Sequence, residues 1–115
     1  MNHVFCTLIK IDEPDAIKVV HPLFNATLLL QGAQLIEFSP KNNQFENMLW
    51  LSPSAQYKHG KPIRGGIPIC WPWFGNLDKN PVVIQDQVKQ QASASAHGFA
   101  RLLPWEIKSI HEDCH

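Results

Sequence analysis

Two short segments of the sequence combine charged, aromatic and glycine residues in a way that suits a small anion. The first spans residues 61–75 and carries Arg64 directly before Gly65 and Gly66. An arginine guanidinium can hold a phosphate through two parallel hydrogen bonds, and paired glycines let the backbone approach a ligand or another chain closely. A surface arginine beside a tight turn is the alternative interpretation, and residue chemistry weighs the two about evenly.

The second segment spans residues 96–101 and carries a histidine and another arginine. His97 could hydrogen-bond sugar hydroxyls or exchange protons near neutral pH, and Arg101 could give an anion a second charge contact. A single histidine is more often structural than functional. Its position at the end of a long polar loop favours function, because loops carry many binding residues.

Three aromatic residues follow the first arginine: Trp71, Trp73 and Phe74. They could stack on the apolar face of a sugar ring, or they could pack in the core. Because three aromatics within four residues cannot all face one way in an extended chain, we expect at least one to be buried. Cys70 beside them is expected to be a small buried apolar residue.

The elements that must position these segments are mostly strands. Short runs rich in β-branched and aromatic residues, separated by Pro, Gly, Asn and Ser, are typical of an antiparallel meander. The long polar stretch 78–95 reads as a surface loop with a helical turn near residues 86–91. We expect strands at residues 3–11, 16–20, 25–30, 34–38, 48–51 and 104–110.

Composition narrows the possible functions. The 115 residues suit one domain, and the 10 basic and 10 acidic side chains cancel, which argues against nucleic-acid binding. No signal sequence or membrane-spanning run is apparent, so we expect a cytoplasmic protein without a membrane partner. The three cysteines, Cys6, Cys70 and Cys114, are expected to be reduced thiols.

A metal site is not expected. His111, Cys114 and His115 lie together near the C-terminus, but no second pair of ligands accompanies them. Zinc sites generally need four fixed ligands, or three and a water molecule.

Taken together, residues 64–75, residues 97–101 and the pair Trp105–Glu106 resemble the glucose-6-phosphate 1-epimerase group of the aldose 1-epimerase superfamily. The resemblance implies an all-β, antiparallel fold: a partial, truncated galactose-mutarotase-like β-supersandwich. Residues 1–115 would form the N-terminal portion of a single β-sandwich domain.

The resemblance also implies a function, the interconversion of the α and β anomers of a hexose 6-phosphate. Arg64, His97 and Arg101 match substrate-binding positions, and we expect the two arginines to converge on the phosphate. Ala96 stands where some members carry a substrate-contacting glutamine. No cofactor is implied, because mutarotation needs only two proton-transfer groups.

In the family that acid and base, a histidine and a glutamate, lie further downstream. No residue here matches them, because Glu106, His111 and Glu112 follow Arg101 too closely. We therefore expect the chain to be inactive or incomplete alone. A non-catalytic sugar-phosphate-binding β module is the alternative, and a structural domain with only core aromatics is a third. The oligomeric state is not predicted.

Overall fold

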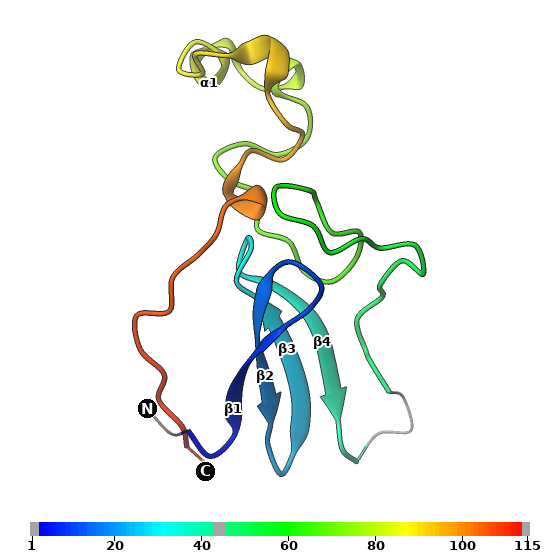
Figure 1. Ribbon diagram of the computed structural model, residues 1–115. Helices are drawn as coiled ribbons and strands as arrows, with labels where there is room; N and C mark the ends of the chain where they lie inside the picture. Colours follow the sequence, from blue (N-terminus) through cyan, green and yellow to red (C-terminus); the bar gives the residue numbers. More distant parts are fainter. Residues whose placement is uncertain (1–2, 43–45, 114–115) are drawn as a thin grey trace.

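Four antiparallel strands form the centre of the computed structural model, which describes residues 3–42 and 46–113 (Figure 1). The strands follow one another in space as they do in the sequence: β1 (Cys6–Lys10), β2 (Asp15–Val20), β3 (Phe24–Leu29) and β4 (Gln34–Pro40). Each overlaps one of the first four predicted strands. The antiparallel all-β prediction is therefore confirmed.

The pairing register gives the sheet two apolar faces. Ile9 pairs with Ala16, which pairs with Leu29, and this row packs against Ile36 and Ile63 as the main core. Residues further along the chain, Leu51, Ala55 and Tyr57, complete the cover over this face.

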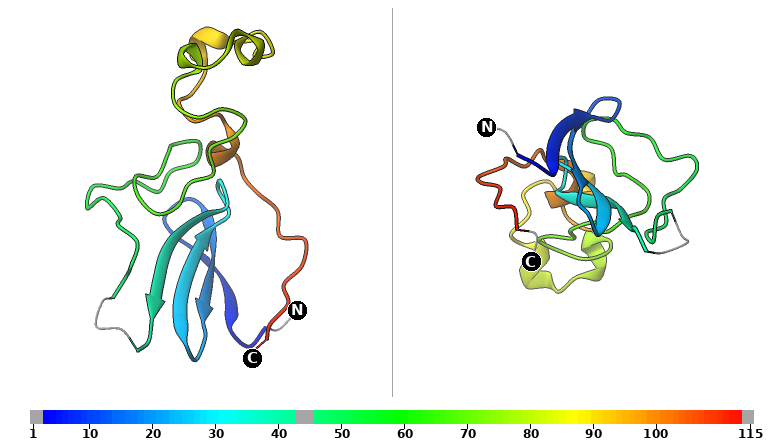
Figure 2. Two further views of the ribbon diagram at one scale, coloured as in Figure 1. Left: turned by 180° about the vertical axis from the view of Figure 1, so that it is seen from behind. Right: turned by 90° about the horizontal axis from the view of Figure 1, so that it is seen from below.

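The opposite face of the sheet has a thinner cover. Leu8 pairs with Ile17, which pairs with Leu28, so successive residues of each strand form a second apolar row. Figures 1 and 2 show a single extended segment descending beside this part of the sheet toward the N-terminus. We call this segment, residues 105–112, the strap.

The predicted strand at 104–110 does not form, and the prediction was wrong there. Pro104 makes one bridge to Gln31, and the Trp105 N–H donates to the Leu30 carbonyl at 2.8 Å. A strand needs a neighbouring strand, and alternation along one chain cannot supply it. The predicted strand at 48–51 is likewise reduced to one bridge, between Leu51 and Gly65.

The long loop contains three short helical turns and projects away from the sheet (Figure 2). They are η1 (Leu77–Lys79), α1 (Val82–Gln85) and η2 (Gln91–Ser93); a fourth, η3 (Ala100–Leu102), follows the loop. The predicted turn at 86–91 was wrong, because the helix begins earlier, directly after Pro81. Proline favours a helix start, since its ring fixes φ and it has no N–H to leave unpaired. Across the described residues, no helix has the length and apolar character needed to cross a membrane.

The two ends of the described chain are held together by one carboxylate. Glu112 accepts hydrogen bonds from the backbone N–H groups of Val4 (2.8 Å), Phe5 (2.6 Å) and Cys6 (3.1 Å), and its Oε1 lies 3.2 Å from Nδ1 of His3. Its side chain is only 15% exposed. Such charge-assisted bonds are stronger than neutral ones, so this contact anchors the strap.

The same contacts set the acidity of Glu112. Desolvation acts to raise the pKa of its carboxyl group, but the N–H groups of Phe5 and Val4, followed by His3 and Cys6, outweigh it and lower the pKa. A lowered pKa means that the released carboxylate takes up a proton more readily than the bound one. The anchor is therefore complete above about pH 4.3, the ordinary value for glutamate, and is lost as pH falls through the lowered pKa.

Replacing this carboxylate should free the strap. In Glu112→Gln, amide exchange at Val4, Phe5 and Cys6 should accelerate by roughly tenfold or more at pH 7, since each loses a hydrogen bond to a charged group. Hydrogen exchange followed by NMR measures this directly. Glu106→Gln, on the same segment but exposed, is the control and should change nothing. Unchanged exchange in Glu112→Gln would show that the strap is held by other contacts.

Candidate functional site

The two motif segments lie side by side. Trp71 forms a parallel bridge with Gly98, and its carbonyl accepts from the N–H groups of Phe99 (3.0 Å) and Ala100 (3.1 Å). These residues are far apart in the sequence, so the pairing is tertiary. It fixes the aromatic part of the first motif against the second motif.

His97 completes this pairing through both its backbone and its ring. Its N–H donates to the carbonyl of Gly75 at 2.8 Å, and its Nδ1 accepts from the Gly75 N–H at 2.9 Å. Since Nδ1 is an acceptor, the neutral ring carries its proton on Nε2, which is then its only donor. His97 also has a backbone φ of +65°, a conformation that residues other than glycine rarely adopt. Such strain is characteristic of sites where surrounding contacts fix one geometry.

The close approach depends on Gly98. Its φ is +72°, and a Cβ at this position would overlap the backbone carbonyl of Trp71. Any larger residue would push the two motif segments apart.

The segment around Arg64 is fixed by a buried glutamine that the sequence analysis did not single out. Gln34, only 1% exposed, donates from Nε2 to the carbonyls of Ile63 (3.2 Å) and Gly65 (2.7 Å). The signal was present in the sequence, because Gln34 lies two residues before Ile36 and so on the core face of β4. Gly65 and Gly66 confirm the expected close approach: a Cβ on either would overlap the backbone of the chain packed against it.

Both arginine-bearing segments are anchored at the turn between β3 and β4. Gly32 packs against the backbone of Arg101, and its N–H donates to the Leu103 carbonyl at 2.7 Å. Gln34, two residues later, holds the segment that carries Arg64. One tight turn therefore positions both segments.

The three predicted binding residues differ in their surroundings. Arg64 is exposed, and within residues 3–42 and 46–113 its guanidinium makes no hydrogen bond or ion pair. Arg101 is half-buried, and its Nη2 donates to the Ala96 carbonyl at 2.8 Å. Its buried Nε has no hydrogen-bond partner among the described residues. The bond to Ala96 draws Arg101 to the residue next to His97. No hydrogen bond or ion pair in the same described ranges joins Arg64 to His97 or Arg101.

The aromatic residues divide as expected. Trp73 is 5% exposed and donates from Nε1 to the Ser95 carbonyl at 3.1 Å, so it is the core member of the group. Trp71 and Phe74 are 59% and 73% exposed. Cys70 is half-buried, so the prediction that it is a small buried apolar residue was wrong.

An apolar hollow of about 440 Å³ adjoins the paired segments. Trp71 and Phe99 contribute one wall, and their rings meet edge-on with centroids 5.8 Å apart. The rest of the lining comes from η3, the strap and the two residues between them: Ala100, Leu103, Pro104, Trp105, Glu106 and Lys108. We call this concavity the apolar hollow.

Among residues 3–42 and 46–113, no group of three or more His, Cys, Asp or Glu side chains is arranged to hold a metal ion. Of the residues considered for a metal site in the sequence analysis, Cys114 and His115 lie outside the described ranges.

The four-stranded antiparallel sheet and the few short helical turns define an all-β protein. A family model described as "Aldose 1-epimerase" matches residues 15–115, and the chain belongs to the aldose 1-epimerase family. The family resemblance inferred from the motifs is therefore confirmed.

Curated relatives and a solved structure agree with this assignment. The chain is 47% identical over 104 residues to a protein of Escherichia coli (strain K12) and 42% identical over 104 residues to one of Salmonella typhimurium (strain LT2), each named "Putative glucose-6-phosphate 1-epimerase". A crystal structure of "a putative mutarotase (YeaD)" from Salmonella typhimurium superposes with a TM-score of 0.80 at 38% identity, covering 99% of this chain. The fold is thus that of the mutarotases.

The match is partial on the relatives' side. It covers 90% of this chain but only 31% of each curated relative, and 34% of the solved mutarotase chain. The chain therefore spans about a third of the length of the proteins it resembles.

The requirement for Gly98 can be tested against a glycine of similar φ. The Gly98→Ala substitution should lower the free energy of unfolding by about 1 kcal/mol because of the positive φ. Overlap of the new Cβ with Trp71 should lower it further, by roughly 1–3 kcal/mol. Gly60 has a φ of +74° but no atom within 4 Å of its would-be Cβ, so Gly60→Ala should show only the first loss. Urea unfolding followed by tryptophan fluorescence compares them. Equal destabilisation would contradict the close packing of the two motif segments.

Proposed function

We propose that this chain forms the phosphate-binding part of a site that interconverts the α and β anomers of a hexose 6-phosphate. The observation that carries the proposal is the hydrogen-bonded pairing of the two motif segments, both anchored at the β3–β4 turn. Arg64, His97 and Arg101 are the residues proposed to hold the substrate.

The chemistry of the three side chains supports this assignment. Arg64 offers a whole guanidinium to solvent, and Arg101 uses only Nη2 for its bond to Ala96. Two guanidiniums can grip a doubly charged phosphate and fix its orientation. The Nε2 proton of His97 is a donor suited to a sugar hydroxyl.

Catalysis of mutarotation needs two further groups. One must remove the proton of the anomeric hydroxyl while the other protonates the ring oxygen. Bound phosphate supplies orientation and binding energy but transfers no proton. We therefore propose an isomerase-family role in which this chain contributes substrate binding. The cytoplasmic location stays a prediction.

Removing the proposed phosphate contact should weaken binding selectively. Glucose 6-phosphate titrated into the chain should bind about tenfold more weakly to Arg64→Ala than to the wild type, because a hydrogen bond to a charged group contributes about 1.5–3 kcal/mol. Arg101→Ala should act in the same direction. Isothermal titration calorimetry measures both.

Lys41→Ala is the matched control, since it removes one positive charge just beyond the other end of β4. The affinity of Lys41→Ala for glucose 6-phosphate should stay within about twofold of the wild-type affinity. An exposed charge at the far end of β4 is screened from the proposed site by salt. Glucose lacking the phosphate should bind all variants weakly. Equal affinity in wild type and Arg64→Ala would contradict the proposed site.

Anomer exchange separates binding from catalysis. In NMR exchange spectra of glucose 6-phosphate, the 115-residue chain should leave the α–β exchange rate near that of buffer, because no acid–base pair matching the family's is assigned to it. Exchange at the rate of a full-length relative, measured alongside, would overturn the incomplete-site interpretation.

A further inference from the structure

Gln31, in the turn between β3 and β4, is a second buried glutamine that holds the backbone ahead of Arg64. It is only 5% exposed. Its Nε2 donates to the Lys61 carbonyl at 2.8 Å, and its Oε1 accepts from the Gly60 N–H at 3.0 Å. Buried side-chain amides are rarely left without partners, and both ends of this amide have one. Gln31 therefore fixes the backbone of these two residues against the turn.

Gln34 continues the same contact along the segment. An amide Nε2 carries two protons, and here both are directed at carbonyls, those of Ile63 and Gly65 on either side of Arg64. Together with the bond from Gln31, three alternate carbonyls of the segment accept from glutamine side chains. The two glutamines thus hold the backbone of Arg64 from both directions along the chain.

The same turn determines where the second arginine lies. Gln31 forms a backbone bridge with Pro104, and between the two glutamines Gly32 packs against the backbone of Arg101. The φ angles of Gly32 (+71°) and Ala33 (+47°) make this turn tight. The separation of the two arginine-bearing segments therefore depends on one short turn and on two side chains that extend from it.

Backbone position matters more for Arg64 than for Arg101. Within residues 3–42 and 46–113, the Arg64 guanidinium makes no hydrogen bond or ion pair, whereas Arg101 is bonded to the Ala96 carbonyl. The Arg64 side chain is exposed and its rotamers are not fixed by a partner in those ranges. The anchored backbone is therefore what limits where the charge of Arg64 can lie.

We infer that Gln31 and Gln34 are positioning residues for phosphate binding, because their side-chain amides fix the separation of the Arg64 and Arg101 segments. Neither glutamine has to touch the substrate, since each acts through the backbone that carries Arg64. The role rests on the proposed sugar-phosphate site, because the separation matters only when both guanidiniums bind one phosphate. A displaced guanidinium loses the alignment that charge-assisted hydrogen bonds to one phosphate require.

A double-mutant cycle tests this role. Glucose 6-phosphate is titrated by calorimetry into the wild type, Gln34→Leu, Arg64→Ala and the double variant. Gln34→Leu keeps a similar side-chain volume but removes the donors, so it should bind about fivefold more weakly than the wild type. In the Arg64→Ala background the same substitution should change the affinity by less than about twofold, because the group that it positions is gone.

Gln31→Leu is the second variant. It removes the anchor at residues 60–61, and its effect on affinity should depend on Arg64 in the same way. Circular dichroism checks that each variant folds, and Gln31→Leu carries the cycle if Gln34→Leu does not fold.

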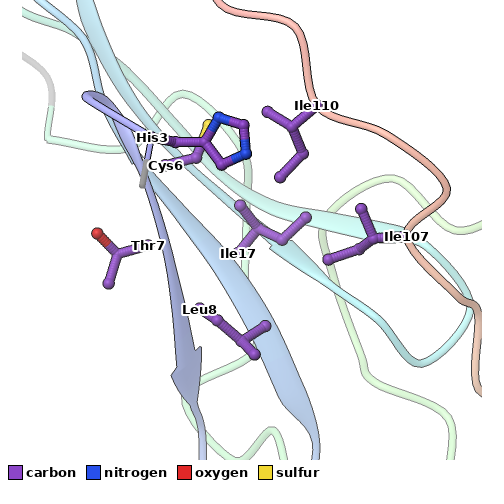
Figure 3. A pocket seen from close by; sticks show the side chains of 7 residues that line it. All are labelled: His3, Cys6, Thr7, Leu8, Ile17, Ile107 and Ile110. Carbon is purple, nitrogen blue, oxygen red and sulfur yellow. The ribbon is translucent and has the colours of Figure 1, made fainter. Parts of the chain in front are cut away.

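Ile17→Ala is the control for general destabilisation. Ile17 lies on the opposite face of the sheet, where its side chain faces Ile107 and Ile110 (Figure 3). Loss of this packing should destabilise the fold but leave the affinity within about twofold of the wild type, since distant sites act independently. Destabilisation alone would weaken binding equally with and without Arg64, whereas loss of positioning would not.

Amide exchange gives a measurement that needs no ligand. The Gly66 N–H donates to the Trp50 carbonyl, and the Ser52 N–H donates to the Arg64 carbonyl. In Gln34→Leu, both amides should exchange about fivefold faster relative to the amides of β2, because the backbone around Arg64 has lost its anchor.

The outcomes separate the positioning role from the proposed function. If the wild type does not bind glucose 6-phosphate, both are overturned together. If it binds, but Gln34→Leu weakens binding equally with and without Arg64, only the positioning role is overturned. Unchanged relative exchange at Gly66 and Ser52 in Gln34→Leu would also overturn that role.

Discussion

The arrangement of the candidate site depends on one backbone contact, the close pairing of Trp71 with Gly98. Two carbonyl-accepted hydrogen bonds and the double contact of His97 with Gly75 join segments that are distant in the sequence. Without this pairing, the histidine and the exposed aromatics would belong to independent loops. Because a Cβ at Gly98 would overlap the Trp71 carbonyl, this close pairing requires a glycine at position 98.

A second constraint acts at the β3–β4 turn. Gly32 receives the backbone of Arg101, and Gln34 holds the carbonyls that flank Arg64. A buried glutamine that satisfies two carbonyls replaces strand pairing at a place where Pro62 and the two glycines would interrupt a regular ladder. The sheet thus serves as the rigid element, and irregular segments carry the polar groups, as is common in binding proteins.

The sequence predicted those features that local pattern determines. The first four strands follow from alternation and turn residues. The geometry of an extended chain predicted that at least one of the three aromatics is buried, and Trp73 is that residue. Residues 104–110 have the same alternation but no neighbouring strand among the described residues. Alternation alone was therefore not sufficient to predict a strand. The Glu112 anchor could not be predicted, because it joins residues more than a hundred positions apart and no local rule connects them. The family resemblance led us to expect both motifs at one site, but no local rule predicted the backbone contacts between Trp71 and residues 98–100 that pair them.

The central claim is that Arg64 and Arg101 grip the same phosphate. A crystal structure of the chain with bound glucose 6-phosphate tests it most directly. We expect phosphate oxygens within about 2.7–2.9 Å of nitrogen atoms of both guanidiniums, the usual length of a charge-assisted hydrogen bond. A phosphate bound elsewhere, or two guanidiniums that face opposite sides of the molecule, would contradict it.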